Sequence, residues 1–189
     1  NWGFNRLMKI LLIQPNASEE VDKEYVSLQF PINLGYIASV LREAGHEIKM
    51  LDFNVTPKEE LDRHILEFKP SMVGMTAMTS SIINVKSIIK NIKTIDKNLI
   101  TVLGGVHASA LPIVTMKEIE DLDYLIFGEG EMTILELANY LENKTKDLEN
   151  KTKELESIKG IVFRTKDRII KTGMRELIEW SSNQESIDM

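Results

Sequence analysis

Five short apolar runs alternate along the chain with segments of helical periodicity. The runs occupy residues 8–13, 47–52, 71–76, 99–103 and 123–127, and each is too short for a helix. Strands that alternate with helices pair in parallel through right-handed crossovers, with helices on both faces of the sheet. The sequence therefore predicts an α/β fold of the flavodoxin-like (Rossmann-like) kind, with a five-stranded parallel sheet in the order 2-1-3-4-5.

The rest of the chain is arranged around this α/β unit. Met8 resembles a natural start, so we expect a leader or tag before it. A charged seven-residue pattern, Glu142–Leu148, recurs as Glu149–Leu155 with one leucine per repeat, too few for a coiled coil. Apolar residues flank Thr165-Lys166-Asp167 and predict a C-terminal β-hairpin. We expect a leader or tag at 1–7 and an α/β domain at 8–142. A charged linker or helix extension follows at 143–157, then a hairpin and the start of a connecting segment at 158–180, and a tail at 181–189.

Composition excludes several classes of function. The 189 residues are 43% apolar and 28% charged, as expected for a globular domain. A net charge of -6 argues against a nucleic-acid partner, because binding phosphates requires a basic face. The chain has no cysteine, which rules out disulfides, thiolate metal sites and iron–sulfur ligation by these residues. No apolar stretch reaches the roughly 18 residues of a membrane span and no signal pattern is present, so we expect a cytoplasmic protein without a membrane partner.

The pair Gly104-Gly105 marks a candidate binding site. It ends the fourth apolar run, where open α/β sheets bind ligands, and glycine lets a ligand approach the main chain closely. In the predicted strand order, the loops after the first, third and fourth strands converge on the same edge. These loops are the long segment 14–30, the small and hydroxylated linker Ala77–Ser81, and the glycine pair itself. On its own the pair equally fits a tight turn with nothing bound.

The sequence contains no self-contained catalytic set. We expect His46 and His64 to be solvated or locally bonded, since neither has an evident partner. Glu129 and Glu131 form a carboxylate pair, but acidic residues in the first turn of a helix are favoured by its dipole without any chemistry. We therefore predict no catalytic residue and no protein metal ligand, and a site lined by hydroxyls, small residues and bare backbone, which suits a large ligand.

Five segments, in this order, resemble the cobalamin (B12)-binding domain that precedes the catalytic domain in B12-dependent radical SAM proteins. They are Phe30–Ala38, Leu41–Ile48, Gly74–Thr79, Leu103–Ala108 and Gly128–Thr133. None is specific alone, but their order and spacing are. The resemblance implies a cobalamin-binding module whose parent enzyme performs methyl transfer or related radical chemistry. It implies that the iron–sulfur cluster and S-adenosylmethionine belong to a radical SAM catalytic domain missing from this chain.

The wider cobalamin-binding family carries an Asp-x-His-x-x-Gly loop, a Ser-x-Leu segment and a Gly-Gly pair. In this chain the glycine of the Asp-x-His-x-x-Gly loop falls on Gly35, and the cobalt-binding histidine of that loop falls on Ile32. The Ser-x-Leu segment falls on Thr76-Ala77-Met78, and the Gly-Gly pair falls on Gly104-Gly105. Isoleucine has no lone pair for a metal, so the resemblance implies a cofactor held base-off without a histidine ligand. It also implies that the glycine pair clears a slot for the nucleotide tail of the cofactor and that segment 14–30 folds over the corrin. The cofactor-binding residues it implies are Pro15, Ile32, Asn33, Leu34, Gly35, Thr76, Met78, Thr79, Ser80, Gly104, Gly105, Val106, His107, Gly128, Glu129 and Gly130.

Two alternatives come from other classes. The N-terminal half of a two-domain glycosyltransferase shows a similar helix-Gly-His-strand pattern around Leu41–Leu51, but leaves the later segments unexplained. A flavodoxin-like interaction domain would have the same fold and no cofactor. Binding of a corrinoid, of a nucleotide sugar, or of neither distinguishes the three.

Overall fold

The computed structural model describes residues 7–16, 31–142 and 148–176 of the chain. The strands are β1 (Lys9–Gln14), β2 (Glu47–Asp52), β3 (Met72–Thr76), β4 (Ile100–Gly104), β5 (Tyr124–Ile126), β6 (Ile161–Arg164) and β7 (Ile169–Lys171). The α-helices are α1 (Ile32–Glu43), α2 (Leu61–Phe68), α3 (Ile82–Ile95), α4 (Val106–Ala110), α5 (Pro112–Glu118), α6 (Glu131–Glu142) and α7 (Leu148–Ser157). Two 3-10 turns, η2 (Lys58–Glu60) and η3 (Thr79–Ser81), precede α2 and α3.

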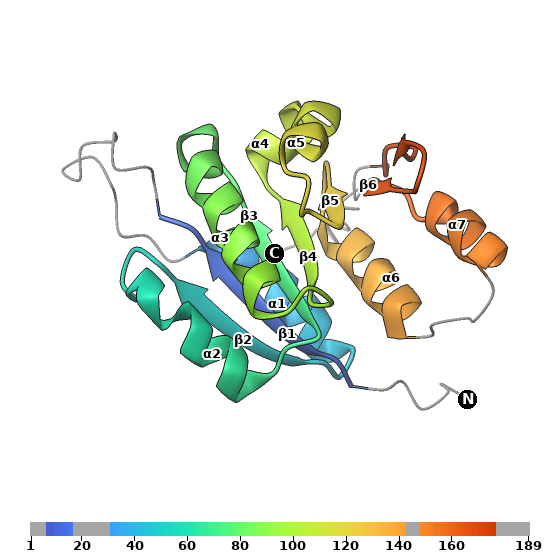
Figure 1. The fold of residues 1–189 in the computed structure, drawn as a ribbon. Coiled ribbons are helices and arrows are strands. Elements are labelled where there is room, and N and C mark those ends of the chain that lie inside the picture. The colour runs from blue at the N-terminus through green and yellow to red at the C-terminus, as the bar shows by residue number, and fades with distance from the viewer. Residues whose placement is uncertain (1–6, 17–30, 143–147, 177–189) are drawn as a thin grey trace, which may run out of the picture.

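The sheet confirms the predicted topology and extends it. Its order is β2-β1-β3-β4-β5-β6-β7, with parallel pairing from β2 through to β5 (Figure 1). The predicted hairpin forms β6 and β7, and β6 pairs antiparallel with β5. The hairpin thus continues the sheet of the α/β domain, so the five-stranded core becomes seven-stranded.

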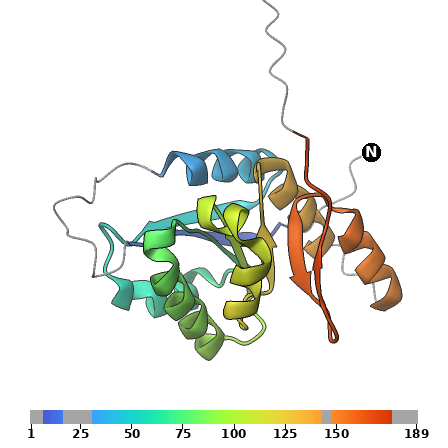
Figure 2. The ribbon, with the colours of Figure 1, turned by 90° about the horizontal axis from the view of Figure 1, so that it is seen from above.

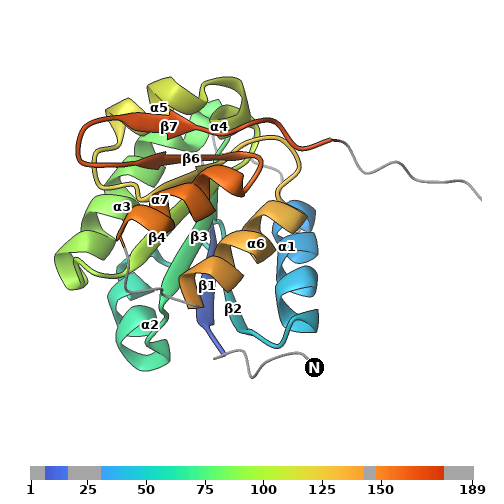
Figure 3. The same ribbon diagram turned by 90° about the vertical axis from the view of Figure 1, so that its right-hand side faces the viewer.

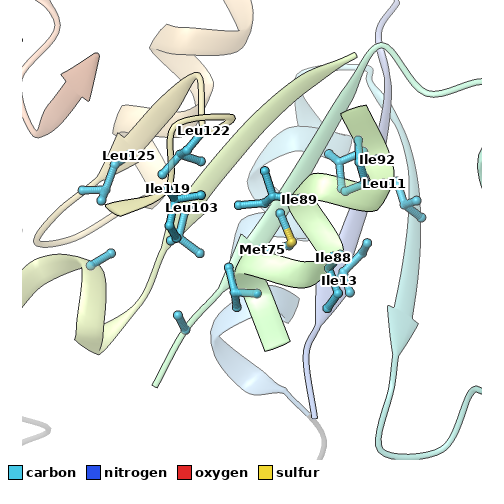
Figure 4. Packing of buried hydrophobic residues seen from close by; sticks show 14 of the residues in the cluster. Leu11, Ile13, Met75, Ile88, Ile89, Ile92, Leu103, Ile119, Leu122 and Leu125 are labelled. Carbon is cyan, nitrogen blue, oxygen red and sulfur yellow. The ribbon is translucent and has the colours of Figure 1, made fainter. Parts of the chain in front are cut away.

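One face of the sheet is covered by α2, α3, α4 and α5. Their apolar residues form one buried cluster with alternate residues of the strands. At its centre, Ile88, Ile89 and Ile92 of α3 pack over Met75 and Leu103, which point to this face from β3 and β4 (Figure 4). Ile89 and Ile92 are fully buried, so this face is filled.

The opposite face is covered by α1, α6 and α7. Ala38 and Leu41 of α1 share a second buried cluster with Leu137 and Ala138 of α6, and Leu155 of α7 completes it. The view from above separates α1 from the helices of the other face (Figure 2), and α1 and α6 lie side by side on their own face (Figure 3). None of the helices in the described ranges has the length and apolar character that crossing a membrane requires.

The local sequence explains where two of the helices begin and end. Pro31 directly precedes α1, and Gly45, at φ 97°, follows its C-terminal end. Pro112 occupies the first turn of α5, where its missing N–H costs no hydrogen bond. The short helix α4 was not predicted, and it places His107 on a helix rather than in a loop.

Candidate functional site

A slot of about 310 Å³ opens between α1 and α6, above the face of the sheet that these helices cover. Strands β1, β3 and β4 supply its floor, and α1, α6, the end of β5 and the segment between β5 and α6 supply its walls. The described residues that line it are Leu12, Asn33, Leu34, Ile37, Gly74, Met75, Thr76, Val102, Gly104, Gly105, Ile126, Gly128, Glu129, Gly130, Glu131 and Ile134.

The strand register gives the slot its depth. Leu12, Gly74 and Val102 are paired neighbours across β1, β3 and β4, and they form the deep row. Thr76 and Gly104 pair two residues further along, at the carboxyl ends of their strands. Residues two apart in a strand point to the same face and lie about 6.6 Å apart. The slot therefore runs roughly two residues deep, from a polar mouth to an apolar floor.

Gly104 leaves the mouth of the slot open. Its backbone is compatible with any residue, and a Cβ placed there would meet only the carbonyl oxygen of Ile126, at 3.9 Å. Gly74 is more confined, because a Cβ there would come within 2.8 Å of Leu12 Cδ2. Of the two glycines, Gly104 is the one whose missing side chain frees space for a ligand.

Gly105 has a different role from the one we expected. Its φ of +95° lies in the region that favours glycine, and a Cβ would lie 2.5 Å from Thr76 Oγ1 and 2.8 Å from the backbone nitrogen of Ala77. The missing side chain makes room for the end of β3, not primarily for a ligand tail. Backbone bonds from Ala77 N to Gly104 O and from His107 N to Ala77 O, both 3.0 Å, hold the two segments together.

Three side-chain hydrogen bonds connect the segments around the mouth. Asn33 Nδ2 on α1 donates to Thr76 Oγ1 at 3.0 Å. Thr79 Oγ1 lies 3.2 Å from His107 Nδ1, which links η3 to α4. The backbone N–H of Gly128 donates to Ser109 Oγ at 3.1 Å. Each bond joins two different loops or helix starts, so the edge is fixed before any ligand arrives.

The structure brings together half of the residues predicted for the site. Asn33, Leu34, Thr76, Gly104, Gly105, Gly128, Glu129 and Gly130 all line the slot. Pro15, Ile32, Gly35, Met78, Thr79, Ser80, Val106 and His107 follow strand ends or lie in the first turns of helices at the same edge, outside the lining. Most of segment 14–30, predicted to cover the ligand, lies outside the described residues.

Three of the predicted residues that lie outside the lining have exposed apolar side chains, and we call these three the rim of the slot. Ile32, Met78 and Val106 are 64%, 64% and 74% accessible, and each lies at or next to the start of a helix. Exposed apolar side chains around a slot are typical of a binding surface for an amphipathic ligand or a partner. This rim and the slot together suit a ligand with one broad part and one narrow part.

Sequence reasoning missed the apolar part of the lining. Leu12, Ile37, Val102, Ile126 and Ile134 have the sequence pattern of ordinary core residues. Gly74, a glycine inside a buried strand, was the one sequence signal for this part of the lining, since such a glycine often marks close packing of a neighbouring side chain or ligand, here the side chain of Leu12. Glu131, predicted as an acidic helix start, also contributes to the lining.

Helices α1 and α6 pack against each other at the opposite end of the sheet from the slot. His46, which follows the turn after α1, is buried, and its Nδ1 lies 3.3 Å from Oε1 of Glu142 at the end of α6. The sequence left open whether His46 is solvated or locally bonded, and its burial excludes the solvated alternative. Burial lowers the pKa of His46 and raises the pKa of Glu142, while the nearby Met8 backbone opposes the rise at Glu142. Apart from this pair, mainly apolar residues join α1 to α6 here.

Comparisons with known proteins agree with this geometry. The model of the B12 binding domain matches residues 23–138. An uncharacterized methyltransferase of Pyrococcus horikoshii is 31% identical over 92% of this chain and 36% of its own length. Cytidylyl-2-hydroxyethylphosphonate methyltransferase of Streptomyces wedmorensis is 29% identical over 86% of this chain and 32% of its own. The chain thus spans about a third of the length of these relatives.

A solved structure shows the same fold. The cobalamin-dependent S-adenosylmethionine radical enzyme OxsB, with aqua-cobalamin and S-adenosylmethionine bound, superposes with a TM-score of 0.73 at 18% identity. The match covers 90% of this chain and 23% of OxsB.

Proposed function

Because the chain belongs to the family of B12-binding domains, we propose that it binds cobalamin at the carboxyl edge of its sheet, as the cobalamin module of a B12-dependent radical SAM enzyme. The observation that carries the proposal is the slot below Gly104, whose lining residues, apart from Leu12, all lie within the match to the family model. A corrinoid has a broad, flat macrocycle and a narrow nucleotide tail. A slot of about 310 Å³ is near the lower limit for a small-molecule pocket, so it suits the tail alone.

The residues of this chain fit such a ligand in two zones. The apolar floor at Leu12 and Val102 accepts the base of the tail, and Asn33 and Thr76 at the mouth supply polar groups for its ribose and phosphate. The exposed rim at Ile32, Met78 and Val106 supports the macrocycle outside the slot. A tail held in the slot leaves the cobalt without its own base as a ligand.

The chain supplies no evident histidine to replace that base. Ile32 occupies the place that the resemblance gives to the ligating histidine, and its side chain cannot bind a metal. His107 is 7% exposed and its Nδ1 lies at hydrogen-bond distance from Thr79, so we assign it to positioning the loop between β3 and α3. The cofactor is accordingly held base-off without a protein histidine.

The chemistry of the parent enzyme lies outside this chain. A bound corrinoid supplies a cobalt centre that carries a methyl group or takes part in radical chemistry. The iron–sulfur cluster and S-adenosylmethionine would be bound by a separate catalytic domain, because this sequence has no cysteine to ligate a cluster. The relatives, about three times longer, have room for such a domain.

The glycosyltransferase alternative loses its support. It rested on residues 41–51, which fall inside the match to the B12 binding domain. A ligand-free interaction domain has no specific observation in its favour and becomes one outcome of the test below.

Cobalamin retention tests the proposal. The purified chain is mixed with hydroxocobalamin and desalted, and its visible spectrum is recorded. We expect about one corrinoid per chain, with the absorption of the base-off form. A protein that leaves the column colourless would refute the proposal.

Two leucine substitutions link retention to the slot. Gly104→Leu adds a side chain at the mouth without backbone strain, and we expect it to abolish retention while the circular dichroism spectrum stays unchanged. Gly173→Leu makes the same change where a Cβ would meet nothing within 4 Å, outside the slot lining, and should retain cobalamin normally. Equal retention by both variants would show that the ligand does not use the slot.

A further inference from the structure

The depth of the slot differs chemically from its mouth. In the described lining, the deep row consists of Leu12, Gly74 and Val102, and the walls beside it carry Leu34, Ile37, Ile126 and Ile134. The polar side chains of the lining belong to Asn33, Thr76, Glu129 and Glu131, which lie at strand ends or at the starts of α1 and α6. A group that reaches the floor therefore meets hydrocarbon.

The backbone of the floor adds few free hydrogen-bonding groups. Residues 10–13 of β1, Met72–Met75 of β3 and the facing part of β4 are paired in register across the sheet. Leu12 and Val102 are 1% and 2% exposed. A polar atom inserted between these strands and the two helices would lose its water without gaining a partner, which is unfavourable.

Natural corrinoids differ mainly in the base at the end of the nucleotide tail. Benzimidazoles present an apolar ring edge, and phenolic bases present a ring without nitrogen. Adenine carries an exocyclic amino group and further ring nitrogens, all of which require hydrogen-bond partners. We propose that the apolar depth of this slot selects corrinoids with a benzimidazole or phenolic base over corrinoids with a purine base. This inference rests on the proposed function and adds a specificity to it.

The residue best placed to test the selection is Ile37. It lies on the wall of the slot, and it is only partly buried, so a change there is compatible with folding. A Cβ at Gly130 would lie 3.5 Å from Ile37 Cδ1, which places the side chain between α1 and the start of α6. Glutamine at position 37 would bring both a donor and an acceptor to the slot, whereas methionine would keep it apolar.

Equilibrium dialysis of the whole chain against four corrinoids provides the test. They are cobalamin, a phenol-based cobamide, an adenine-based cobamide, and cobinamide, which has no tail. We expect the phenol-based form, whose base cannot bind the cobalt, to bind at least as tightly as cobalamin, which must first release its benzimidazole nitrogen from the metal. The adenine-based form should bind at least about tenfold more weakly, the cost of one or more unpaired polar atoms. Cobinamide should also bind more weakly than cobalamin.

Each failure has a distinct meaning. Equal binding of the adenine-based and benzimidazole-based forms would overturn the selection while leaving cobalamin binding intact. Equal binding of cobinamide and cobalamin would show that the slot does not hold the tail, which also overturns the inference. Binding of none of the four would refute the proposed function itself.

The variants supply the control. Ile37→Gln should narrow the difference between cobalamin and the adenine-based form, and Ile37→Met should preserve it. An unchanged difference in Ile37→Gln, with cobalamin still bound, would assign the preference to something other than the apolar slot and would overturn the inference.

Discussion

The two faces of the sheet use neighbouring residues of β3 in opposite ways. Met75 points toward α3 and packs among its isoleucines in a filled core (Figure 4). Gly74 belongs to the opposite face, where it lines the floor of the slot between α1 and α6. The α3 face is therefore packed throughout and contributes to stability, whereas the α1–α6 face leaves a slot open at the carboxyl ends of the strands. We infer that stability and ligand binding can be changed almost independently in this domain.

The largest expected effect is on the filled face. Ile89→Ala removes a fully buried side chain between α3 and the sheet, and should lower the free energy of unfolding by about 3–4 kcal/mol. Ile37→Ala is the matched change on the slot wall and should cost about 1 kcal/mol, because its side chain is only partly buried. Urea unfolding measures both. Equal losses would mean that the slot wall is as tightly packed as the α3 face.

The glycine pair provides the next comparison. Gly105→Ala places a Cβ against Thr76 and Ala77 at a φ of +95°, and should destabilise the fold by about 2–3 kcal/mol. Gly104→Ala has neither conflict and should change stability by less than about 1 kcal/mol. Thermal or urea unfolding of the two variants would contradict this account if Gly104→Ala were the more damaging change.

The buried pair at the closed end of α1 and α6 predicts a dependence on pH. The raised pKa of Glu142 means that the folded chain releases this proton less readily than the unfolded chain. The contribution of Glu142 to stability is therefore fully present below its ordinary pKa of 4.5. It is lost as the pH rises through the higher pKa that Glu142 has in the folded chain. His46 acts in the opposite direction, because its lowered pKa reduces stability as the pH falls below 6.5.

Glu142→Gln separates these two contributions. The amide carries no charge that burial could penalise, so we expect the variant to be more stable than the parent by about 1 kcal/mol at pH 8, with little difference near pH 4. The fall in stability below pH 6.5 that comes from His46 should remain. Unfolding curves at several pH values measure this difference in free energy of unfolding between variant and parent. A difference that stays constant with pH would contradict a buried carboxyl at this position.

The sequence predicted the layout of the sheet better than the chemistry of the slot. Periodicity and short apolar runs were sufficient for the parallel strands and their order, since these are local signals joined by a strong rule of handedness. Pairing of β6 with β5 was not indicated, because a hairpin sequence does not specify the strand on which it docks. The five-residue helix α4 is too short to show a periodic pattern.

The parts of the site that escaped prediction depend on contacts between distant segments. Glycine and hydroxyl residues at strand ends were found because they are conspicuous, but Val102 and Ile134 resemble any core residues until α1 and α6 are in place. The sequence likewise could not distinguish Gly104 from Gly105, although one faces the slot and the other faces β3. His46 gave no sign of Glu142, which joins it only through the packing of α1 against α6.

The central claim is that the slot holds the nucleotide tail and that no protein histidine takes its place below the cobalt. Electron paramagnetic resonance of the bound cobalt(II) corrinoid tests it directly, because an axial nitrogen ligand splits the signal into triplets. This account predicts a spectrum without nitrogen splitting in the parent chain. Triplet splitting, from the benzimidazole of the tail or from a histidine such as His107, would contradict it.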